Sequence, residues 1–84
     1  MKLVFTRQGW EDYLDWQSND RTLVKRINRL IEDVMRSPFA GIGKPEPLRH
    51  TGPDVWSRRI TEEHRLMYLV QDDAVMIIQA RFHY

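Results

Sequence analysis

The last third of the chain alternates apolar and polar side chains, and this alternation constrains the fold more than any other feature. Successive side chains of a strand point to opposite faces, so the pattern predicts three strands with one face on an apolar layer. The even-numbered set comprises Trp56, Ile60, Leu66, Tyr68, Val70, Met76, Ile78, Ala80 and Phe82. All three strands keep this parity only if each loop has an odd number of residues or a bulge corrects the register. Residues 62–64 and 71–73 are suitable three-residue loops.

With this parity, Arg59, Arg65, Arg81 and His83 share the odd-numbered face. Guanidinium groups bind phosphate, and an imidazole titrates near neutrality and can transfer protons. Taken alone, each arginine is better explained as a solvated surface residue, and a histidine near a chain end as an exposed terminus. Their shared parity favours the alternative, a basic face that binds and cuts a phosphodiester.

Two helices are expected before these strands. Residues 2–5 form an apolar run that predicts a first strand, and Thr6 can cap a helix containing Trp10 and Tyr13. A second helix follows possible caps at residues 18–20 and ends before Pro38. Its buried stripe is predicted to contain Leu23, Val24, Ile27, Leu30, Ile31, Val34 and Met35.

Several single side chains carry narrower expectations. Spacing predicts Trp10 and Trp56 in the core, whereas Trp16 falls off the main stripe and is a candidate for a protein interface. Arg29 and Asp33 are spaced for an ion pair on the second helix. His64 lies in a predicted turn, where it is interpreted as structural or solvent-facing.

The element order predicts an α+β fold, with two helices packed on a small, mainly antiparallel sheet. At 84 residues the chain forms one domain, residues 1–84, with a single core. It contains no cysteine, and its net charge of +1 does not by itself indicate a nucleic-acid partner. Without a membrane-spanning or signal segment, it is expected to be cytoplasmic and to make no membrane contact.

The loop over residues 39–50 holds the remaining candidates. Glu46 stands between Pro45 and Pro47, and a carboxylate on a stiff loop suits a base of fixed position. The residues alone nevertheless favour a solvated loop acid. Lys44, Arg49 and His50 are equally compatible with phosphate contacts and with plain loop charges. No histidine cluster has metal-ligand spacing and no glycine-rich phosphate loop is present, so neither a metal nor another cofactor is expected.

Three stretches resemble the YoeB toxins of the RelE/ParE superfamily. They are residues 44–48 (KPEPL), residues 56–66 (WSRRITEEHRL) and residues 81–84 (RFHY), and the resemblance extends over the whole chain. It implies a microbial-ribonuclease-like fold and an mRNA endonuclease that acts in the ribosomal A site. Arg49 departs from the family, where lysine is expected, and residues 51–55 also differ.

The resemblance also implies roles for individual residues. Glu46 would be the general base, His83 the general acid and Arg65 the stabiliser of the transition state. Tyr84 and Arg59 would position the RNA.

The expected partners are a YefM-like antitoxin, the 70S ribosome with its mRNA, and a second copy of the chain. Two other functions remain open: a ParE-like inhibitor of DNA gyrase, and a non-catalytic module that binds RNA or the ribosome through its arginines. Lys44, Arg49, Arg59 and Arg81 are the candidate RNA-binding residues.

Overall fold

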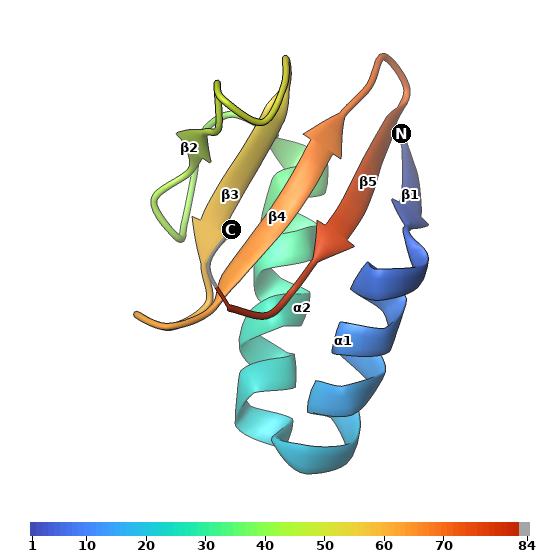
Figure 1. Cartoon of the computed structure of the whole chain (residues 1–84), viewed down its shortest axis with the longest axis vertical. Helices are drawn as coiled ribbons and strands as arrows, with labels where there is room; N and C mark the ends of the chain where they lie inside the picture. Colours follow the sequence, from blue (N-terminus) through green and yellow to red (C-terminus); the bar gives the residue numbers. More distant parts are fainter. Residues whose placement is uncertain (83–84) are drawn as a thin grey trace.

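The computed structural model describes residues 1–82 and has two helices packed on one face of a five-stranded sheet (Figure 1). The elements are β1 (Lys2–Phe5), α1 (Arg7–Asn19), α2 (Arg21–Arg36), β2 (Glu46–Pro47), β3 (Val55–Arg59), β4 (Arg65–Val70) and β5 (Ala74–Gln79). The strand order is β1-β5-β4-β3-β2, with β1 parallel to β5 and the other neighbours antiparallel. This confirms the predicted α+β class. No helix within residues 1–82 is both long and apolar enough to cross a membrane.

Both helices begin at the predicted caps. The Thr6 hydroxyl accepts a hydrogen bond from the Gly9 N–H at 3.0 Å, and the Asp20 carboxylate accepts one from the Leu23 N–H at 3.1 Å. Gly9 has a further role, because a Cβ at this position would collide with the Ile77 carbonyl oxygen. The glycine therefore lets α1 approach the backbone of β5 closely.

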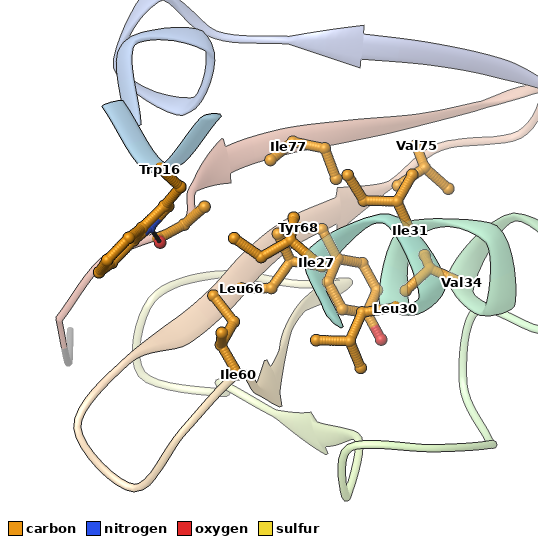
Figure 2. Packing of buried hydrophobic residues seen from close by; sticks show 11 residues of the cluster. Trp16, Ile27, Leu30, Ile31, Val34, Ile60, Leu66, Tyr68, Val75 and Ile77 are labelled. Carbon is orange, nitrogen blue, oxygen red and sulfur yellow. Dashed lines mark hydrogen bonds between the residues drawn. The ribbon is translucent and has the colours of Figure 1, made fainter. Parts of the chain in front are cut away.

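The core lies between the helices and the sheet (Figure 2). Its buried members are Trp16, Ile27, Leu30, Ile31, Val34, Ile60, Leu66, Tyr68, Val75, Ile77 and Ala80. The α2 members, Ile60, and Leu66 and Tyr68 of β4 are among the predicted core residues. A smaller cluster of Leu48, Val55 and Met67 lies apart from this core, with Leu69 and Ile78 packed against it.

The predicted parity is wrong for β5, where Val75 and Ile77 enter the core instead of Met76 and Ile78. Val70 pairs with Val75, and the Gln71 N–H donates to the Ala74 carbonyl, so four residues rather than three separate the paired positions. An even-numbered connection reverses the faces of the following strand. A register shift opposite Met67 and Tyr68 then adds one residue to β5, and Ala80 is again buried, as predicted.

Two of the tryptophan predictions are also wrong. Trp16 is a core residue with 8% of its surface exposed, whereas Trp10 is 47% exposed. Trp16 packs in the core, where its indole N–H is satisfied by the Ala80 carbonyl at 2.7 Å, a partner far away in the sequence. Trp56 packs against the core, as predicted.

Candidate active site

Glu46 is carried by β2, a two-residue edge strand that the sequence predicted as loop. Glu46 pairs with Ser57 and Pro47 pairs with Trp56 on β3. A proline is tolerated here because one side of an edge strand needs no hydrogen-bond donor. The pairing fixes the backbone of Glu46 against the sheet, while its side chain is exposed.

Arg59 and Arg65 form a directly opposed pair on β3 and β4. Ser57 and Arg59 are two residues apart on one strand, so both point away from the helices, and Glu46, opposite Ser57, shares that face. Two residues of a strand span about 7 Å, and neighbouring strands lie about 5 Å apart. The predicted face shared by Arg59 and Arg65 is confirmed, and the carboxylate of Glu46 belongs to the same surface.

Neither arginine of this pair has an ion-pair partner within residues 1–82. The Nε atom of Arg65 is buried and has no hydrogen-bond acceptor there. Three other arginines in this range do have ion-pair partners: Arg7 pairs with Glu11, Arg58 with Asp33 and Arg81 with Asp15. A buried donor without an acceptor costs about 1–3 kcal/mol. A bound anion such as a phosphate would remove that cost.

Lys44 and Arg49 lie on the loops that enter and leave β2, and both are exposed. Lys44 adopts a left-handed backbone with φ of 52°, which turns the chain into the strand. His50 follows in the turn after β2 and is also exposed. The structure therefore places these basic residues at both ends of the strand that carries Glu46.

Arg81 does not join the arginine pair, contrary to the predicted parity. It forms an ion pair with Asp15 of α1, and its guanidinium carbon lies 4.9 Å from the centroid of the Trp16 ring. The reason is the path of the chain after β5, because both backbone polar groups of Ala80 are bound by α1. The Ala80 N–H donates to Asp12 at 2.9 Å, and its carbonyl accepts from Trp16.

His83 and Tyr84 lie outside the described residues, so their predicted positions are untested. The described chain ends at Phe82, whose carbonyl accepts a hydrogen bond from the Arg65 N–H at 3.1 Å. Its N–H donates to Nδ1 of His64 at 2.8 Å. His64 is buried, which confirms the structural reading of this residue.

Arg58 is the residue near the site that sequence reasoning missed. Its side chain is fully buried and bonds to the loop that leads from α2 toward β2. Its acceptors are the Asp33 carboxylate at 2.5 Å, the Tyr68 hydroxyl, and the carbonyls of Ser37, Ala40 and Ile42. The available signal was an arginine at a core-facing position between Trp56 and Ile60.

Asp33 bonds to this loop rather than forming the predicted pair with Arg29. Its carboxylate accepts from the Ile42 N–H at 2.9 Å and from Arg58. These two donors, the Ile42 N–H first, hold the pKa of Asp33 below its usual value. Gly41 is required beside them, since its φ of 128° disfavours other residues and a Cβ would collide with the carboxylate.

Among residues 1–82, the site is thus a surface with one carboxylate on β2 and two guanidinium groups, on the adjacent strands β3 and β4, that form no ion pair within that range. Within the described part of the chain, no three His, Cys, Asp or Glu side chains are grouped so that they could hold a metal ion. Such a surface can bind an anion between the arginines and accept a proton at Glu46.

Comparison with known proteins identifies the family. A family described as the YoeB-like toxin of bacterial type II toxin–antitoxin systems matches residues 5–84. Toxin YoeB of Escherichia coli K12 is 56% identical over 84 residues, which is all of both chains. These matches agree with the resemblance inferred from the three sequence stretches.

Solved structures give the same result. The YoeB/ParE toxin from Agrobacterium tumefaciens superposes with a TM-score of 0.95 at 51% identity, over all of both chains. YoeB from Staphylococcus aureus is 41% identical both as a dimer, with a TM-score of 0.92, and in a heterotetrameric complex with YefM, with a TM-score of 0.89. Each of these alignments covers 100% of this chain and 98% of the other. The chain therefore belongs to the YoeB-like toxins of bacterial type II toxin–antitoxin systems.

Proposed function

We propose that this toxin is a ribosome-dependent endoribonuclease that cuts mRNA in the A site and thereby inhibits translation. The observation that best supports the proposal is the surface shared by Glu46, Arg59 and Arg65. A carboxylate beside two arginines that have no carboxylate partner within residues 1–82 provides a base and an anion site on one rigid sheet. Phosphodiester cleavage by internal attack requires both.

In the proposed reaction, Glu46 removes the proton of a ribose 2′-OH, and the oxygen attacks the adjacent phosphorus. The bond to the 5′-oxygen breaks as His83 donates a proton to that oxygen. Arg65, helped by Arg59, stabilises the negative charge that develops on the phosphorane. The products are a 2′,3′-cyclic phosphate and a 5′-OH. Tyr84, Lys44 and Arg49 would position the RNA, and the reaction needs no metal.

Arg81 has a smaller part in this proposal than the other basic residues. Its guanidinium is already paired with Asp15 and packed over Trp16. An RNA contact through Arg81 would have to be made by the remaining donors of that group. We therefore expect substitution of Arg81 to affect the protein mainly through its contact with α1.

The proposed partners follow from the family and from the relatives. The Staphylococcus aureus toxin forms a dimer and a heterotetramer with YefM. We propose that this chain likewise forms a dimer and is held inactive by a YefM-like antitoxin. The 70S ribosome would present the message.

The decisive experiment is a reconstituted translation reaction with a defined mRNA and the purified toxin. Primer extension maps new 5′ ends for the wild type, for Glu46→Gln and for His83→Gln, with naked mRNA in parallel. Proton transfer by a positioned side chain contributes about 10²–10⁴-fold, so each variant should cut slower by that factor. The Glu46 side chain is exposed, and circular dichroism checks that both variants are folded.

Other results would point to other functions. Blocked translation without cuts, unchanged by either substitution, would indicate a module that only binds the ribosome. A protein that has no effect on translation but inhibits supercoiling by gyrase would indicate the ParE-like function.

A further inference from the structure

The described chain ends in a segment whose backbone is bound at almost every polar group. Asp12 and Trp16 of α1 bind the N–H and carbonyl of Ala80, as described above. At Phe82, the carbonyl accepts from the Arg65 N–H and the N–H donates to the His64 ring. Phe82 is the residue joined covalently to the proposed general acid, His83.

The His64 imidazole is held in place by burial and by contacts with two other rings. It is 9% exposed and packs edge-on against Trp16, with ring centroids 4.8 Å apart. The centroid of the Phe82 ring lies 5.2 Å from the centroid of the His64 ring. The backbone N–H of His64 donates to the Thr61 hydroxyl at 3.0 Å, and this bond fixes the turn that carries the ring.

The bond to Phe82 also fixes the tautomer of His64. Because Nδ1 accepts the Phe82 N–H, that nitrogen carries no proton, and the ring proton is on Nε2. Nε2 lies 3.6 Å from a carboxylate oxygen of Glu63. The ring is therefore oriented with its acceptor toward the terminal segment and its donor toward Glu63.

Phe82 needs such a partner because its backbone is unfavourable. Its φ is 58°, in the left-handed region that bulky residues rarely occupy. Unusual backbone conformations persist only where surrounding contacts hold them, and they gather at functional sites. A packing role alone would be met by a phenylalanine at position 64, which offers no acceptor.

We propose that His64 is a positioning residue, whose Nδ1 holds Phe82 in its left-handed conformation and so sets the direction in which the chain continues to His83. This inference rests on the proposed function, in which His83 is the general acid. His64 itself does not touch the RNA.

Two substitutions separate positioning from packing. His64→Phe keeps the aromatic ring but removes the acceptor, whereas His64→Asn keeps an acceptor near the position of Nδ1 but removes most of the ring. If His64 serves packing alone, His64→Phe should be both more stable and more active as a nuclease than His64→Asn. Positioning predicts that it is the more stable variant and the poorer nuclease.

The first readout is kinetic. A displacement of about 1 Å at a reacting group can cost 10²-fold in rate. His64→Phe should therefore lower kcat for cleavage of A-site message by about that factor with KM unchanged, and His64→Asn should restore most of kcat. Tyr13→Phe, which removes a hydrogen bond to Asn28 elsewhere on the molecule, is the matched control and should match the wild type.

The second readout does not depend on cleavage. Amide hydrogen exchange at Phe82, measured by NMR, should be slow in the wild type and in His64→Asn and fast in His64→Phe. A wild-type protein that leaves message intact would contradict the proposed function, and amide exchange would still show whether His64 holds Phe82. Wild-type kcat in His64→Phe, or slow exchange at Phe82 in that variant, would overturn the positioning role.

Discussion

Arg59 and Arg65 face each other across β3 and β4 although their like charges repel. Directly opposed like charges destabilise an antiparallel pair, and the buried Nε of Arg65 adds an unsatisfied donor. Neither feature helps the fold. Two opposed guanidinium groups are expected of a surface that binds a phosphate, because a bound anion would supply the missing negative charge.

This conflict predicts opposite effects on stability and activity for Arg65→Met. Removal of the charge should raise the free energy of unfolding by about 0.2–1 kcal/mol, since the repulsion across the strand pair disappears. Loss of a group that stabilises a transition state typically costs about 10²–10³-fold in kcat. Urea unfolding and the cleavage assay measure the two effects. A variant that is less stable yet cuts at the wild-type rate would make Arg65 a structural residue.

At the scale of elements, the loop between α2 and β2 depends on one buried side chain. Arg58 connects three loop carbonyls with Asp33 of α2 and Tyr68 of β4. The loop leads directly to Lys44 and Glu46, so the position of the proposed base depends on a residue that does not contact substrate. Local periodicity predicted α2, but it carried no information on which strand side chain would bind the loop.

Arg58→Lys should destabilise the protein strongly. An ammonium cannot replace the planar fork, and several carbonyls and the Asp33 carboxylate would lose their donors. Disruption of a buried charged pair typically costs 3–5 kcal/mol, and because Asp33 is partly exposed we expect about 3 kcal/mol in urea unfolding. Arg7→Lys, on the exposed pair with Glu11, is the control and should change stability by less than about 0.5 kcal/mol. Equal effects would contradict the role of Arg58.

The same loop predicts a pH dependence. The Ile42 N–H and Arg58 lower the pKa of Asp33 in the folded protein, so the carboxylate form is favoured there. Its contribution to stability is fully present at neutral pH and is lost as the pH falls below about 4, through the lowered pKa. Asp33→Asn should be less stable than the wild type at pH 7, and the difference should shrink at low pH. A difference that is constant from pH 7 to pH 2.5 would exclude this explanation.

At the scale of the whole molecule, local signals predicted more than long-range ones. The caps at Thr6 and Asp20 and the stripe of α2 depend on near neighbours, and all were predicted. The inward face of β5 depends on how four residues close a turn, a choice the sequence leaves open. Trp16 is buried because α1 binds the chain after β5, a contact that no local pattern contains.

The same difference between local and long-range signals applies to the candidate site. The parity of β3 and β4 predicted the face of Arg59 and Arg65, and the resemblance to the YoeB toxins indicated Glu46, which β2 carries to that face. The predicted position of Arg81 was wrong because the chain turns toward α1 after Gln79. His83 and Tyr84 stay predictions.

The most direct test of the proposed cleavage uses a message with a single 2′-deoxy nucleotide at the A-site scissile position, presented on the 70S ribosome. Internal attack predicts that the wild-type toxin cuts the all-ribose message and leaves the substituted one intact, because the attacking 2′-oxygen is absent. Cleavage of both messages at the same rate would contradict internal attack and, with it, the role proposed for Glu46.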